Sequence, residues 1–123
     1  MSKKWIWFVP AGIVAVAIFA LSTFLSVPIE VEGVNHLDKW QHALAYMVLS
    51  SSFLFAFKKS TMLSRKVTVQ VLLIAGLYGL SLEFLQYQFF SRRFFDWADA
   101  LANILGALLG FVVFRFFVRY LIK

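Results

Sequence analysis

The sequence predicts an all-α fold, an integral membrane four-helix bundle with both termini in the cytoplasm. Of its 123 residues 62% are apolar and only 15% are charged, against about 25% charged residues in soluble domains. Four apolar stretches occupy residues 5–27, 40–57, 67–90 and 97–122, and each is close to or above the ~20 residues that cross a bilayer as a helix. The basic residues gather at the ends of these stretches, which also makes nucleic acid a poor partner.

The first apolar stretch, residues 5–27, follows Lys3 and Lys4 and precedes Pro28. A cleaved signal peptide is the alternative interpretation, with residues 15–17 as a small-residue cleavage site. The stretch is longer than the roughly 7 to 15 apolar residues of a signal peptide. We therefore expect an uncleaved first helix.

The connecting loops predict the orientation. Residues 28–39 contain three acidic side chains and one lysine, whereas residues 58–66 contain four basic side chains. Basic loops stay in the cytoplasm, so we expect both termini and residues 58–66 on that side and the other two loops outside. No repeat or flexible linker is visible, and we predict a single domain over residues 1–123.

Aspartates mark the start of the second and fourth helices. Asp38 and Gln41 have the spacing of a capping box, and Asp96 can cap the fourth helix, with Asp99 at the positive end of its dipole. These capping roles are a sufficient structural explanation for the aspartates. The third helix follows the basic loop and leads to Arg92 and Arg93.

Arg92 and Arg93 lie on the predicted outer side, where basic residues are not favoured. One interpretation is structural, an ion pair with Asp96 together with contact to lipid headgroups. The other is functional, because the guanidinium fork of donors matches a phosphate group. The sequence leaves both open.

Capping cannot explain His42, Glu83 and Asn103, which lie inside apolar stretches beyond the first helical turn. With the predicted topology all three fall in the outer leaflet. Ionisable groups at such depth are costly unless they are paired or hydrated, so they usually face the interior of the bundle.

Polar residues and glycines share one face on each of the last three helices. Spacings of three or four residues relate Asp38, His42 and Tyr46 on the second, Gly76, Gly79, Glu83 and Gln86 on the third, and Asp99, Asn103, Gly106 and Gly110 on the fourth. We expect these faces to converge, with glycines that allow close backbone approach below a polar cup at the outer surface.

The segments DKWQHALAYMVL, YGLSLEFLQ and RRFFDWADALANILGALLG together resemble the VanZ-like family of bacterial membrane proteins. The matching residues are Asp38, Lys39, His42, Tyr46, Glu83, Gln86, Arg93, Asp96, Asp99, Asn103 and Gly106. The resemblance covers about residues 36–113 and implies a small multi-pass protein of the cell envelope. The founding member of the family is linked to low-level resistance to the glycopeptide antibiotic teicoplanin, and the family brings no settled biochemical activity. The sequence departs from the family between Gln86 and Arg93, where proline or glycine is common and YQFFSR stands here.

Three functional interpretations follow. The first is an outward-facing pocket for an anionic headgroup, such as that of a lipid-linked cell-wall intermediate. In it Lys39 and Arg93 meet phosphate, while His42, Glu83 and the other matching polar residues, Asp38, Tyr46, Gln86, Asp96 and Asn103, shape the pocket.

The second interpretation is an intramembrane hydrolase or transferase whose tentative catalytic residues are His42, Glu83 and Asp99. His42 would act as general acid or base, oriented by Asp38 or Asp99. The third is a purely structural network of buried ion pairs that locks three helices together.

A metal held by His42, Glu83 and an aspartate is a variant of the enzyme interpretation. The spacing matches no standard metal motif, so the sequence predicts neither a metal nor another cofactor. The chain has no cysteine and thus no thiolate ligand. Membrane lipids are the expected surroundings, and the sequence does not indicate an oligomeric state.

Overall fold

The computed structural model describes residues 4–24, 37–89 and 97–120. A short 3-10 helix, η1 (Lys4–Phe8), leads into α1 (Val9–Phe24), and α2 (Leu37–Lys59), α3 (Arg65–Phe89) and α4 (Trp97–Tyr120) follow. The described residues contain no strand. The predicted all-α four-helix fold is confirmed, and the single-domain assignment stays a prediction.

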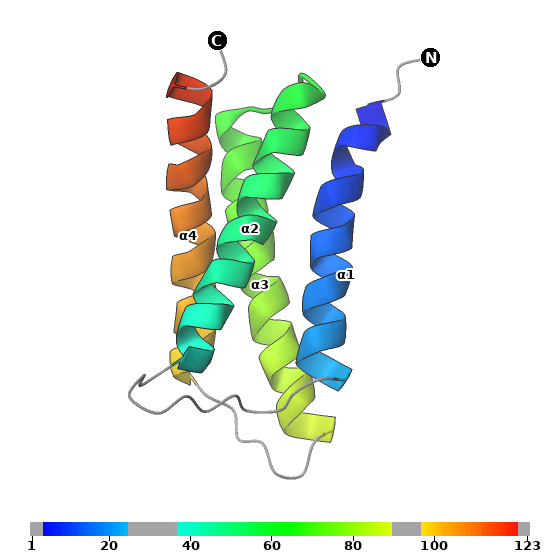
Figure 1. The fold of residues 1–123 in the computed structure, drawn as a ribbon, viewed down its shortest axis with the longest axis vertical. Coiled ribbons are helices and arrows are strands. Elements are labelled where there is room, and N and C mark those ends of the chain that lie inside the picture. Colours follow the sequence, from blue (N-terminus) through cyan, green and yellow to red (C-terminus); the bar gives the residue numbers. More distant parts are fainter. Residues whose placement is uncertain (1–3, 25–36, 90–96, 121–123) are drawn as a thin grey trace.

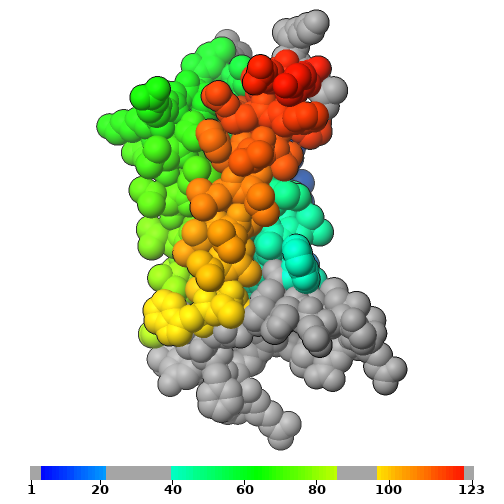
Figure 2. All heavy atoms as spheres, turned by 90° about the vertical axis from the view of Figure 1, so that its left-hand side faces the viewer, coloured from blue at the N-terminus to red at the C-terminus, as the bar shows by residue number. Residues whose placement is uncertain are grey.

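The four helices run alternately up and down beside one another (Figure 1). The start of the chain, the end of α4 and the turn between α2 and α3 lie at one end of the bundle, whereas α2 and α4 begin at the other end (Figure 1). Figure 2 shows α4 running along one face, with α3 on one side and the beginning of α2 on the other. The end of the bundle where α2 and α4 begin carries the polar residues discussed below.

Three described segments are long and apolar enough to cross a membrane, Lys4–Leu21, Arg65–Leu85 and Trp97–Tyr120. The remaining helix, α2, has 23 residues but is less apolar, because Gln41, His42 and the serines at 50–52 lie along it. It contacts η1 and all three other α-helices. The less apolar helix α2 therefore packs against every other helix, while side chains such as Leu44 on α2 and Leu73 and Ile74 on α3 are exposed in the manner of a lipid-facing surface.

The most extensive helix contact joins α2 to α4. A Cβ atom on Gly106 would meet the backbone of Ala43, with the Ala43 Cα only 2.8 Å away. A Cβ atom on Gly110 would lie 2.6 Å from the Met47 carbonyl oxygen and would also meet Ser50 Oγ. The expected close approach at these two glycines is confirmed, and it is directed at α2.

The glycines of α3 act differently from the prediction. A Cβ atom on Gly76 would make an ordinary contact of 3.6 Å with Ile104, so no close approach requires glycine there. At Gly79 a Cβ atom would lie 2.9 Å from the Cβ of Asn103. Gly79 therefore makes room for a polar side chain of α4 and not for its backbone.

A core of apolar side chains fills the middle of the bundle and includes Ile18, Tyr46, Leu49 and Leu82. The hydroxyl of Tyr78 donates a 2.6 Å hydrogen bond to the carbonyl oxygen of Ala15 and so joins α3 to α1. All four helices are thus tied into one core.

Candidate functional site

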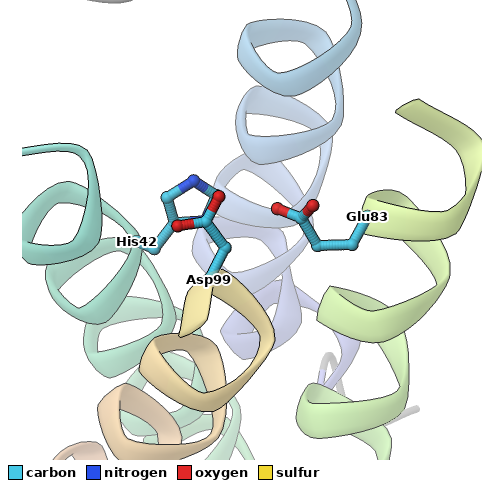
Figure 3. Close-up of side chains that lie close together, drawn as sticks. All are labelled: His42, Glu83 and Asp99. Atoms are coloured by element: carbon cyan, nitrogen blue, oxygen red, sulfur yellow. The ribbon is translucent and has the colours of Figure 1, made fainter. Parts of the chain in front are cut away.

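Three helices bring an imidazole and two carboxylates together at the end of the bundle where α2 and α4 begin. His42 comes from α2, Glu83 from α3 and Asp99 from α4, and one ring nitrogen and one oxygen of each carboxylate all lie within 4.8 Å of one another. The three side chains point toward one another (Figure 3). Glu83 and Asp99 are only 4% and 8% exposed, and His42 is half-buried. The predicted convergence of these three helix faces is therefore observed.

A fourth side chain, Asn103 of α4, fixes the imidazole. His42 Nδ1 lies 2.9 Å from Asn103 Oδ1, and Asn103 is 1% exposed. Since an amide oxygen only accepts hydrogen bonds, Nδ1 carries the proton and donates it. The lone pair of the neutral ring then belongs to Nε2, the nitrogen that can take up a proton or bind a cation.

The sequence predicts Asp38 or Asp99 as the residue that orients His42 and Asn103 as a ligand-binding residue. Both expectations stay predictions, and the structure adds Asn103 as a hydrogen-bond partner of His42. In the structure Asn103 makes the bond to Nδ1, in the space that Gly79 leaves open. His42 and Asn103 lie on facing stripes of α2 and α4, and this placement is the sequence signal that could have paired them.

Tyr46 lies one helical turn beyond His42 and belongs to the apolar core. It is 2% exposed, and its ring centroid is 6.3 Å from that of Tyr78. The ligand-binding role predicted for Tyr46 stays a prediction. In the structure its ring is part of the apolar core next to the cluster on α2.

Among the described side chains, charge is divided between the two ends of the bundle. The described acids are Glu83 and Asp99, both in the cluster. The start of η1, the end of α2, the start of α3 and the end of α4 lie at the opposite end (Figure 1), and these helix ends carry Lys4, Lys58, Lys59, Arg65, Lys66 and Arg119. A cavity of about 570 Å³ also lies there, lined by Lys58, Arg115 and Arg119 among others. Its lining includes none of the three cluster residues His42, Glu83 and Asp99.

The VanZ/LLP1 family model matches residues 2–118 of the chain. The chain belongs to the VanZ/LLP1 family. Comparisons with curated proteins and with solved structures give no match. Family membership and the three apolar helices make this a VanZ-like membrane protein.

Five of the site residues predicted for this VanZ/LLP1 protein lie outside the described side chains. They are Asp38, Lys39, Gln86, Arg93 and Asp96. The helix start itself is described, and α2 begins at Leu37, so Asp38 is in its first turn. The roles assigned to these residues stay predictions.

The described part of the VanZ/LLP1 cluster supports two kinds of chemistry. His42 Nε2 beside two carboxylates can exchange a proton, and the same three groups are ligand types for divalent cations. An anion meets repulsion from the carboxylates of Glu83 and Asp99 unless a positive charge lies between them. A phosphate at this site is therefore favoured by positive charge beside it, from a basic side chain or a bound cation.

Proposed function

We propose that this VanZ/LLP1 protein is a multi-pass cell-membrane protein that binds the polar, anionic headgroup of a lipid, such as a lipid-linked cell-wall intermediate. Through this binding it contributes to low-level resistance to glycopeptides such as teicoplanin. The observation that carries the proposal is the convergence of His42, Glu83, Asp99 and Asn103 from three helices at one end of an apolar bundle.

The division of charge among the described side chains supports the orientation in this proposal. The basic end of the bundle, which includes Lys4 and Arg119, faces the cytoplasm under the positive-inside rule. Both termini are then cytoplasmic, and the cluster lies in the extracytoplasmic leaflet of the cell membrane. A headgroup at the outer membrane surface can reach it without crossing the bilayer.

In this proposal the headgroup meets two kinds of group. Arg93 and Lys39 supply positive charge to its phosphate, and the fork of the Arg93 guanidinium fits two phosphate oxygens. The carboxylates of Glu83 and Asp99 accept hydrogen bonds from hydroxyl or amide groups of the same ligand. Asp38, Tyr46, Gln86 and Asp96 complete the pocket.

A second candidate function, an intramembrane hydrolase or transferase, has one observation in its favour. The hydrogen bond from Nδ1 to Asn103 directs Nε2 of His42 toward a group of buried carboxylates. This is the arrangement of a general base held in one tautomer. Turnover of a headgroup, and not binding alone, would distinguish this function.

The proposal is tested by glycopeptide susceptibility. The wild-type chain, His42→Ala and Glu83→Gln are expressed in a susceptible bacterium, and the membrane level of each protein is measured together with growth in teicoplanin. Both variants are expected to lose the added resistance at unchanged protein level. Gln70→Leu, at an exposed polar position on the same helix as Glu83, is the matched control and retains it. Full resistance in Glu83→Gln refutes the proposal, and collapse of both variants supports the structural network instead.

The phosphate contact has its own test. Arg93→Lys keeps the positive charge and loses the two-pronged geometry. We expect this variant to lose resistance, and unchanged resistance would count against phosphate recognition by Arg93.

A further inference from the structure

The cluster contains a complete set of protein ligands for a metal ion. One imidazole nitrogen and two carboxylate oxygens come from His42, Glu83 and Asp99, all within 4.8 Å of one another. We propose that these three residues bind one divalent cation of the Zn²⁺ or Mn²⁺ type, and that this cation receives the phosphate of the headgroup. The second half of this inference rests on the proposed function, whereas the metal site does not.

The distances are close to those of a bound ion. Zinc lies about 2.0–2.2 Å from imidazole nitrogen and carboxylate oxygen, so two ligands of one ion are at most about 4.4 Å apart and about 3 Å when adjacent. The observed separations of up to 4.8 Å require side-chain movements of about an ångström or less to reach that range. Each ligand is on a different helix.

Asn103 gives the imidazole the orientation of a metal ligand. Histidine ligands almost always donate their second ring N–H to a carbonyl or carboxylate, which fixes the tautomer and presents the other nitrogen to the metal. His42 Nδ1 donates to Asn103 Oδ1 at 2.9 Å. The contact depends on glycine at position 79, where a Cβ would lie 2.7 Å from Asn103 Nδ2. Asn103 is therefore a positioning residue for this site.

The chemistry of the ligands selects the type of ion. Imidazole suits transition metals, whereas carboxylates suit harder cations, and the mixture favours Zn²⁺ or Mn²⁺ over Mg²⁺ or Ca²⁺. Two carboxylates and a neutral imidazole carry a formal charge of −2, which a divalent ion balances within an apolar bundle. Three protein ligands leave coordination positions open for phosphate oxygen or water.

The metal also offsets the repulsion between the two carboxylates and the phosphate of a headgroup. Carboxylates alone repel phosphate, but a cation held between them and the phosphate is attracted to both. The sequence offered His42, Glu83 and an aspartate as possible metal ligands, but their spacing matches no standard metal motif because they lie on three separate helices. The structure brings the three ligand atoms within 4.8 Å of one another, with Asp99 as the aspartate.

The metal site is tested first without any lipid. The full chain is purified in detergent, freed of metal with a chelator and titrated with Zn²⁺ or Mn²⁺. The bound metal is measured by inductively coupled plasma mass spectrometry. We expect about one ion per chain. His42→Ala and Glu83→Gln each weaken binding at least about tenfold, and Asn103→Leu weakens it about 10- to 100-fold without removing a ligand. His36→Ala, which removes the chain's other histidine, is the control and leaves affinity unchanged.

A measurement on the wild-type protein keeps the test valid if a variant does not fold. Bound Mn²⁺ is expected to show, by pulsed electron paramagnetic resonance, the nitrogen coupling of one directly bound imidazole. Absence of binding, or binding without that coupling, overturns the metal site.

The headgroup is then tested in nanodiscs of phosphatidylcholine with or without a polyprenyl phosphate. Metal-loaded protein is expected to bind the polyprenyl phosphate at least about tenfold more tightly than chelator-treated protein, and inorganic phosphate competes only weakly if the lipid is the ligand. Equal binding with and without metal overturns the contact between cation and phosphate, the second half of the inference, and leaves the proposed function intact. Metal binding with no polyprenyl phosphate bound refutes the headgroup function and leaves the metal site intact.

Discussion

Nδ1 of His42 on α2 donates a 2.9 Å hydrogen bond to Oδ1 of Asn103 on α4, across 61 positions of sequence. Asn103 is 1% exposed and occupies the space that Gly79 leaves on α3. One polar contact therefore fixes the relative position of three helices and the tautomer of the only imidazole among the described side chains.

The first prediction concerns the free energy of this contact. His42→Ala, Asn103→Ala and the double variant form a double-mutant cycle, which isolates the pair from other effects of each substitution. Interhelical hydrogen bonds in membrane proteins contribute about 0.6 kcal/mol on average and up to about 1.7 kcal/mol. Because Asn103 is buried and His42 is half-buried, we expect a coupling free energy within that range, measured by reversible unfolding in detergent. A coupling near zero would show that the two side chains do not interact.

The second prediction compares two neighbouring serines on α2. Ser50 is fully buried and donates a 2.9 Å hydrogen bond to the carbonyl oxygen of Ala107 on α4. Ser51 is less buried and bonds within its own helix, to Val48. Ser50→Ala removes a contact between helices and should lower the free energy of unfolding by about 0.6–1.7 kcal/mol. Ser51→Ala should change it by less than about 0.5 kcal/mol, and equal effects would contradict the assignment.

The fold was largely predictable because the apolar stretches that cross a bilayer are long and end at charged residues. The predicted boundaries differ from the observed ones at the first two helices. The apolar stretch expected as one helix from residue 5 begins as the 3-10 helix η1, and α1 begins only at Val9. The apolar stretch of α2 begins at residue 40, but the helix begins at Leu37, next to Asp38, which the capping pattern places at its start. The polar residues of α2 are also the reason that it is not among the three segments apolar enough to cross a membrane.

The residues of the site were predictable, but their pairing was not. Helical spacing placed His42, Glu83, Asp99 and Asn103 on facing stripes, and they do converge. Which nitrogen meets which oxygen depends on helix rotation and side-chain rotamers, which a spacing of three or four residues does not specify. Ser50 continues the four-residue spacing of His42 and Tyr46 on α2, a signal in the sequence that the prediction left unused.

The third prediction concerns the close contact of α2 and α4 at Gly106 and Gly110. A methyl group on Gly106 would overlap the Ala43 backbone, and one on Gly110 would lie 2.6 Å from the Met47 carbonyl oxygen. Because backbone cannot move aside as a flexible side chain can, Gly106→Ala and Gly110→Ala should each lower the free energy of unfolding by about 1–3 kcal/mol, the usual cost of overpacking. Reversible unfolding in detergent measures this change.

Two other glycines provide matched controls for that measurement. Gly12 has no atom within 4 Å of an added Cβ, and Gly76 has only a 3.6 Å contact. Gly12→Ala should be neutral or stabilising by up to about 1 kcal/mol, because alanine favours helix more than glycine does. If Gly106→Ala behaves like Gly12→Ala, the helices are not in close contact. If the added methyl group of Gly106→Ala moves α2 and α4 apart, it also moves His42 away from Asn103. Resistance to teicoplanin should then fall, although no residue of the cluster has changed.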